Sequence, residues 1–162
     1  AKAGDRILLA AFGEGCDALL VEVTPAIAQA SERRGVKGAL AARRVAHAPY
    51  SGFKVGAAVL DEQGRIHAGC NVENAAYPQG VCAEAAALSA MVLAGGRRAA
   101  ALLVLGAGPT WVTPCGGCRQ KLREFAAADT PVLVADGQGV QQRFTLEQLL
   151  PYSFGPENLK PE

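Results

Sequence analysis

The sequence predicts an α/β protein: a three-layer α/β/α sandwich in which helices cover a mixed β-sheet. Two observations point to this fold. From residue 49 onward, short apolar segments typical of strands alternate with Ala- and Leu-rich segments typical of helices, and glycine-containing turns separate them. Half of the 162 residues are hydrophobic and 19% are charged, which suffices for one compact core.

An extension, residues 1–38, is expected to precede the main domain, residues 39–162. Two apolar runs, Ile7–Phe12 and Leu19–Val23, flank a glycine-containing turn and predict a β-hairpin. A lone hairpin is marginally stable in water, so it should be loose or should pack on an oligomer. We therefore expect that deletion of residues 1–38 leaves the main domain's activity largely intact.

Two helices are predicted after the hairpin. Thr24 and Pro25 fit the N-cap and the first position of a helix that should end where Gly35 interrupts it. A second helix is expected over Ala39–Ala48. It should stop there because the residue before Pro49 is disfavoured in the helical region.

The main domain is expected to alternate strands and helices. Apolar segments bounded by turns predict the strands, and longer Ala- and Leu-rich segments predict the helices. Thr145 and Gln148 have the spacing of a capping box, which indicates a short final helix before an irregular tail. The predicted strands are Phe53–Leu60, Arg65–Cys70, Ala101–Leu105, Pro131–Ala135 and Val140–Phe144, and the predicted helices are Val81–Ala94 and Cys115–Ala127.

Charge and hydropathy exclude several kinds of partner. The net formal charge is +1 and the basic residues are scattered, whereas a polynucleotide-binding protein usually has a clustered basic stripe. No apolar run reaches the roughly 18 residues that span a bilayer. The sequence therefore predicts a small, nearly neutral partner, with no nucleic acid and no membrane, and the lack of an export leader predicts a cytoplasmic location.

Three cysteines and one glutamate form the candidate reactive site. Cys115 and Cys118 stand three residues apart at the start of a predicted helix, so both sulfurs lie on one face. Cys82 can complete a three-sulfur site if the two helix starts meet. Three protein ligands plus one open position are typical of catalytic zinc, which lowers the pKa of a bound water. Glu84 lies beside these ligands and can take that water's proton.

These residues resemble the zinc-dependent cytidine deaminases, specifically the small homotetrameric type with three cysteine ligands. The resemblance covers residues 39 to the end, and it implies the cytidine deaminase fold and the hydrolysis of free cytidine and 2′-deoxycytidine in pyrimidine salvage. Five stretches carry it: 48–56 (APYSGFKVG), 69–77 (GCNVENAAY), 82–84 (CAE), 114–120 (PCGGCRQ) and 149–154 (LLPYSF).

The resemblance assigns a role to each matching residue. Cys82, Cys115 and Cys118 would bind one zinc ion per subunit, and Glu84 would carry protons to N3 of the base and to the leaving ammonia. The expected substrate contacts are Asn71 and Glu73 to the ribose 3′-hydroxyl, Phe53 against the base, the backbone of Ala83 at the pyrimidine edge, and Tyr77 and Phe154 in a neighbouring subunit's site.

Two neighbouring positions concern the charge of the metal site. Many members of the family carry Arg directly after the catalytic glutamate, where this chain has Ala85. Three thiolates on Zn²⁺ leave a negative site, so compensation would have to come from two helix N-termini. Arg119 would support the metal site.

Several alternatives remain open from the sequence. A structural zinc would need a fourth protein ligand, and Cys16 and Cys70, which we expect to be buried small hydrophobes, lack ligand-pair spacing. A blasticidin-type deaminase would share the metal motifs. A polynucleotide deaminase would need a basic channel. His47 and His67 are expected to be structural or surface residues, and residues 4–23 resemble the closing segment of thiolase-fold condensing enzymes.

Overall fold

A computed structural model describes residues 6–10, 18–22 and 25–159. The predicted turn at Gly13–Gly15, the N-cap Thr24 and Cys16 lie outside the described residues. The chain divides into two compact units, residues 1–33 and 34–162, with the boundary inside a helix. In the first unit, β1 (Arg6–Ala10) pairs antiparallel with β2 (Ala18–Glu22), which confirms the predicted hairpin strands.

The two helices predicted around residues 25–48 are wrong, because one continuous helix, α1 (Pro25–Arg44), covers most of this region. Gly35 does not interrupt it. A Cβ on Gly35 would lie 3.6 Å from the Leu103 side chain, and one on Gly38 would lie 3.5 Å from Ile66. Both distances are ordinary van der Waals contacts, so these glycines lie on the face of the helix that packs on the sheet, and this packing outweighs the low helix propensity of glycine.

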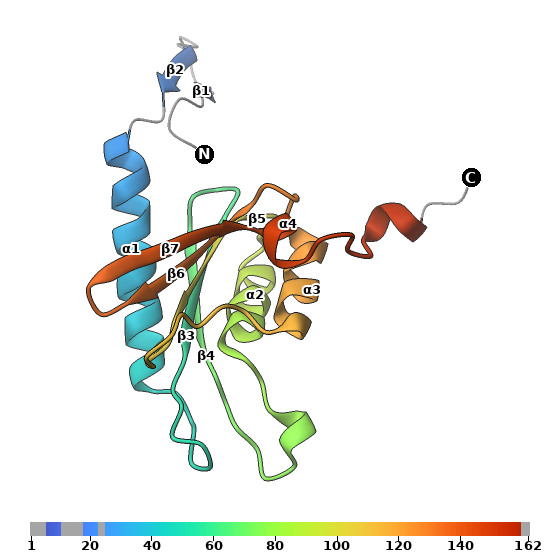
Figure 1. Ribbon diagram of the computed structural model, residues 1–162. Helices are drawn as coiled ribbons and strands as arrows, with labels where there is room; N and C mark the ends of the chain where they lie inside the picture. The colour runs from blue at the N-terminus through green and yellow to red at the C-terminus, as the bar shows by residue number, and fades with distance from the viewer. Residues whose placement is uncertain (1–5, 11–17, 23–24, 160–162) are drawn as a thin grey trace. The chain divides into compact units, whose positions relative to one another are not determined.

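The second unit contains a five-stranded mixed sheet with the strand order β4-β3-β5-β6-β7 (Figure 1). The pairs β3–β4, β3–β5 and β6–β7 are antiparallel, and β5–β6 is parallel. The predicted strands are confirmed, with ends that shift by up to three residues. They are β3 (Gly56–Asp61), β4 (Ile66–Cys70), β5 (Ala99–Leu105), β6 (Pro131–Asp136) and β7 (Gly139–Thr145).

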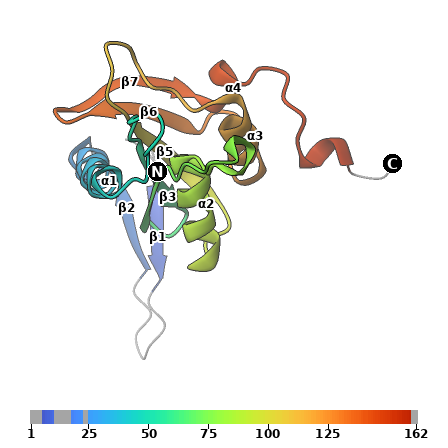
Figure 2. The ribbon, with the colours of Figure 1, turned by 90° about the horizontal axis from the view of Figure 1, so that it is seen from below.

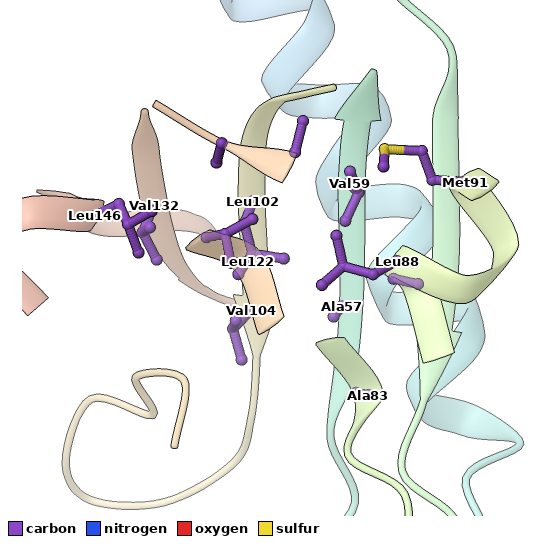
Figure 3. Close-up of a cluster of buried hydrophobic side chains, with 13 residues drawn as sticks. Ala57, Val59, Ala83, Leu88, Met91, Leu102, Val104, Leu122, Val132 and Leu146 are labelled. Atoms are coloured by element: carbon purple, nitrogen blue, oxygen red, sulfur yellow. The ribbon is translucent and has the colours of Figure 1, made fainter. Parts of the chain in front are cut away.

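Helices cover both faces of this sheet, as predicted (Figure 2). Residues 34–44 of α1 contribute to a cluster with Ala58, Leu103 and Leu133 on one face. On the other face, α2 (Ala83–Leu93) and α3 (Gly116–Phe125) pack over the larger cluster, which includes Met91 and Leu122 (Figure 3). Burial of these side chains at about 25 cal/mol per Å² is the main force that seats the two helices.

The helix α2 sits unusually close to β4. A Cβ on Gly69 would lie 2.4 Å from the backbone nitrogen of Ala87 and 2.5 Å from the carbonyl oxygen of Ala83. Only glycine allows this approach, so Gly69 sets the position of the helix N-terminus, where Cys82 and Glu84 lie.

The remaining elements are short. Thr145 and Gln148 form a complete reciprocal capping box on α4 (Leu146–Leu149), as their spacing predicts. Single 3₁₀ turns occur at η1 (Tyr77–Gln79) and η2 (Pro156–Leu159). Within the described part of the chain, no helix has the length and apolar character that a membrane crossing requires.

Candidate active site

The strand register brings the site's segments to one edge of the sheet. Gly56 at the start of β3 pairs with Cys70 at the end of β4 and with Leu105 at the end of β5. The segment before β3, the 71–82 loop and the 106–114 loop therefore all leave the sheet at the same edge. The last two lead directly into α2 and α3.

The three predicted ligands come together where these two helices begin. Cys82 is the N-cap of α2, Cys115 is the N-cap of α3, and Cys118 lies in the first turn of α3. Their sulfur atoms all lie within 4.8 Å of one another, and 3.8 Å separates the sulfurs of Cys82 and Cys115. Cys118 is buried, whereas Cys115 is exposed, so the cluster is open on one side.

This donor set fits zinc. Sulfurs on a tetrahedral zinc with bonds of about 2.3 Å lie ~3.8 Å apart, which matches the separation of Cys82 and Cys115. No other cluster of this kind occurs among the described residues, and a fourth cysteine, Cys70, is not part of it. Three protein ligands leave one position for water or substrate.

The electrostatics of the thiols favour a bound cation. Burial raises the pKa of Cys82 and, together with the nearby Glu84 charge, that of Cys118. Burial also opposes ionisation of Cys115, but hydrogen bonds from the Cys118 backbone and the neighbouring thiols outweigh it, so its pKa is lowered. The protein alone thus favours one thiolate, and a divalent cation is needed to hold three. The two helix N-termini also stabilise negative charge here.

Glu84 lies beside this cluster in the first turn of α2 and is only 5% exposed. Burial raises the pKa of its carboxyl group, an effect that a hydrogen bond from Cys118 partly offsets. A carboxyl whose pKa is raised above its usual value, next to the metal ligands, is suited to accept and return a proton. The neighbouring Ala83 is fully buried, and its methyl side chain has no polar atom. Any polar contact from Ala83 to the site would therefore come from its backbone.

A cavity of about 490 Å³ leads away from Cys82. Glu73 on its wall is partly exposed to solvent, and hydrogen bonds lower its pKa, chiefly one from the Ser51 hydroxyl and then one from the Tyr50 backbone. Glu73 is therefore an ionised acceptor. The lining comprises Tyr50, Ser51, Asn71, Val72, Glu73, Asn74, Tyr77, Gly80, Val81 and Cys82.

Asn71 bridges to the segment before β3. Its Oδ1 accepts from the backbone N–H of Val55 at 2.8 Å, and its Nδ2 donates to the carbonyl oxygen of Phe53 at 2.9 Å. One N–H and one lone pair of the amide remain for a ligand. A Cβ on Gly108 would lie 3.9 Å from the Phe53 ring, so the ring borders the loop that leads to Cys115.

The two aromatic residues assigned to a neighbouring subunit's site are exposed. Tyr77 is 76% exposed and makes an edge contact with Tyr50. Phe154, 58% exposed, does not line the cavity of its own chain. Hydrogen bonds from α3 hold its segment: Gln120 donates to the Phe154 carbonyl, and Arg123 donates to Ser153 and pairs with Glu157.

Arg119 lies behind the metal ligands. Its three guanidinium nitrogens donate to the Pro114 carbonyl, the Leu149 carbonyl and the Thr113 hydroxyl, at 2.7–3.1 Å. It therefore holds the loop in front of Cys115 in place. Because the guanidinium group makes these three hydrogen bonds, Arg119 acts on the site only by holding the backbone next to the metal ligands.

The other residues singled out in the sequence lie outside the cavity, whereas six residues that line it carried no predicted role of their own. Cys70 is only partly buried, which corrects the prediction that it is fully buried; His47 is exposed; and His67 is buried 2.8 Å from Asp61 at the far end of β3. The lining residues without a predicted role of their own are Tyr50, Ser51, Val72, Asn74, Gly80 and Val81. For Ser51, the signal in the sequence was its position two residues before Phe53, which is the spacing of a Ser/Thr turn.

Comparison with known proteins agrees with this geometry. Residues 29–134 match the family described as the cytidine and deoxycytidylate deaminase zinc-binding region. A cytidine deaminase of Sporosarcina psychrophila is 43% identical over 118 residues, which cover 73% of this chain and 87% of that protein. One from Halalkalibacterium halodurans is 41% identical over 124 residues, 76% and 94% of the two chains.

Solved structures give the same result. The crystal structure of a cytidine deaminase from Burkholderia pseudomallei superposes with a TM-score of 0.71 at 40% identity, over 75% of this chain and 98% of that one. That of Mycobacterium leprae gives 0.63 at 39% identity, over 74% and 96%. With its three-cysteine cluster and adjacent glutamate, the chain belongs to the cytidine deaminase family of zinc-dependent hydrolases.

Proposed function

We propose that this protein hydrolyses the 4-amino group of free cytidine and 2′-deoxycytidine, giving uridine or 2′-deoxyuridine and ammonia. The observation that carries the proposal is the meeting of two helix N-termini, which brings three cysteine sulfurs within 4.8 Å of one another beside the buried Glu84. The cavity next to Cys82 has room for a nucleoside.

The residues divide the chemistry between them. Zinc, when bound by Cys82, Cys115 and Cys118, supplies an activated water for attack on C4 of the pyrimidine. Glu84 accepts a proton from the attacking water and delivers it to N3. It then takes the remaining proton of that water, from the new hydroxyl group on C4, and passes it to the departing amine, so both protons of the water are used. Its burial keeps bulk water from competing for that proton.

Asn71 and Glu73 are proposed to bind the ribose 3′-hydroxyl at the other end of the cavity. Neither role involves the 2′-hydroxyl, so both nucleosides fit. The ionised Glu73 would repel a 3′-phosphate, which argues against a polynucleotide substrate. Phe53 packs on the base, and the Ala83 backbone meets its polar edge.

A homotetramer is proposed as the working form. Phe154 and Tyr77 are large, exposed aromatics outside the described hydrophobic clusters, and exposed aromatics of this kind mark interfaces. They would complete a neighbouring subunit's site. The described cysteines are free thiols, and a zinc site made of thiolates persists in a reducing compartment. We therefore propose that the enzyme acts in the cytoplasm, in pyrimidine salvage.

The first experiment is to measure uridine and ammonia from cytidine, with zinc content determined on the same sample. The wild type should turn over and lose activity on chelation. Glu84→Gln should keep its zinc and lose turnover, and Cys118→Ser should lose both. Cys70→Ser, a cysteine outside the cluster, is the matched control and should keep both.

The same experiment separates the rivals. Zinc bound without turnover of either nucleoside would favour a structural zinc or a modified nucleoside of the blasticidin type. Activity restricted to single-stranded DNA or RNA would contradict the proposal.

A further inference from the structure

The residue Ser51 has no role in the proposed chemistry, yet it joins two of the proposed substrate contacts. Its hydroxyl donates to Oε1 of Glu73, and its backbone N–H donates to Oε2 of the same carboxylate at 3.2 Å. The Tyr50 N–H adds a third hydrogen bond, to Oε2, at 2.9 Å. Both oxygens of Glu73 are therefore held by the same short turn.

The same hydroxyl also holds the residue proposed to pack on the base. Ser51 Oγ accepts from the backbone N–H of Phe53 at 2.9 Å. Since a hydroxyl has one hydrogen, which is committed to Glu73, its lone pair is what Phe53 uses. Polarisation along such a chain strengthens each hydrogen bond.

A second link closes the network. Asn71 donates to the Phe53 carbonyl, which ties Phe53 directly to the segment that carries Glu73. The Phe53 N–H is linked to Glu73 through the Ser51 hydroxyl. Charged acceptors give the strongest hydrogen bonds in a protein, and the Ser51 hydroxyl makes the largest contribution to the lowered pKa of Glu73.

From this geometry we infer that Ser51 is a positioning residue for substrate binding, which aims the Glu73 carboxylate at the ribose 3′-hydroxyl and sets the Phe53 backbone at the base. This inference rests on the proposed function. Ser51 acts through Glu73 and Phe53, so its loss should weaken binding of the nucleoside and leave the chemistry of Glu84 unaffected.

The test compares 2′-deoxycytidine with 2′,3′-dideoxycytidine, which differ only in the 3′-hydroxyl. In Ser51→Ala, KM for 2′-deoxycytidine should rise about tenfold, the usual effect of losing a hydrogen bond to a charged group, with kcat within about twofold. KM for the dideoxynucleoside should rise less, because without a 3′-hydroxyl it is affected only through Phe53. A purely structural defect would raise KM for both substrates by the same factor, and that result would overturn the inference.

Two variants of Ser51 with side chains of the same shape control for misfolding. Ser51→Thr keeps the hydroxyl and Ser51→Val replaces it with a methyl group of the same shape. In Ser51→Thr, the ratio of the two KM values should stay within about twofold of the wild-type ratio, whereas Ser51→Val should lose this discrimination. Equal ratios in the two variants would overturn the inference. A wild-type protein with zinc but no cytidine turnover would instead refute the proposed function.

Discussion

Two glutamates of the candidate site, Glu73 on the cavity wall and Glu84 beside the metal ligands, show how surroundings can suit the same side chain to two tasks. Glu84 is buried beside the metal ligands, and burial raises its pKa. Glu73 is partly exposed, and three hydrogen bonds from the 50–51 turn lower its pKa. Desolvation favours the neutral acid, whereas donated hydrogen bonds favour the carboxylate. Glu84 can therefore exchange a proton, while Glu73 remains a fixed acceptor.

The surroundings of the two residues differ in the same way. Glu84 lies on a helix held over the core by close backbone packing at Gly69. Glu73 lies in a loop and is held by side-chain and backbone hydrogen bonds. Changes at the first glutamate should affect kcat, and changes at the second should affect KM.

Removing the carboxylates separates these effects most strongly. Glu84→Gln should lower kcat by ~10² to 10⁴, because proton transfer is lost. Glu73→Gln should raise KM about tenfold, with little change in kcat, because only one acceptor for the ribose is lost. Steady-state kinetics on zinc-loaded protein measure both. Equal losses of kcat in the two variants would contradict the division of roles.

The packing of the helix can be broken at Gly69. Gly69→Ala places a Cβ 2.4 Å from the Ala87 nitrogen, so α2 has to move. Overpacking of this kind costs about 1–3 kcal/mol, and zinc content should fall with it. Thermal unfolding and metal analysis provide the measurement. Gly137→Ala, with no atom near the added Cβ, is the control; a Gly69→Ala protein as stable as the control would refute the close fit.

Acidification should reveal the opposite pKa shifts. Because its pKa is raised, Glu84 becomes protonated at a higher pH than an ordinary glutamate and ceases to accept a proton. Glu73, with its lowered pKa, keeps its charge until the pH falls further, aided by the nearby His47 charge. As the pH falls, kcat should therefore decline before KM rises. The reverse order in a pH series would show that the assignment is wrong.

A smaller effect is expected from added charge at the metal. Ala85→Arg restores the cation that many family members carry beside the thiolates. If two helix N-termini already compensate the charge, kcat should change by less than about threefold. The proton concentration at the midpoint of the acidic limb of the pH profile should change by less than the same factor. A substantial rise in rate, with the acidic limb moved to lower pH, would mean that the natural site lacks compensation.

Removal of the first unit should have the smallest effect. Deletion of residues 1–33 should leave kcat, KM and zinc content unchanged, because the catalytic cluster and cavity lie within residues 34–162. Deletion through residue 44 should destabilise the protein, since residues 36–40 pack on the sheet. Lost activity in the shorter deletion would assign the first unit a role in assembly.

The residues proposed to do the chemistry could be identified from the sequence. Cys82, Glu84, Cys115 and Cys118 were identifiable because metal ligation and proton transfer demand these residue types at short spacings. The strands and helices that hold them were also predictable, since apolar periodicity and turn residues are local signals. The error at α1 arose because Gly35 and Gly38 contact a sheet that is distant in sequence.

The tertiary structure decided what depends on residues far apart in the chain. Cys82 and Cys115 meet because the register of β3 with β4 and β5 brings two loops to one edge, and no local pattern encodes that register. Burial and hydrogen bonding then give Glu84 and Glu73 opposite pKa shifts. Since a pKa depends on the atoms that surround a group, two identical residues acquire the different acidities on which their proposed functions rest only when the chain folds.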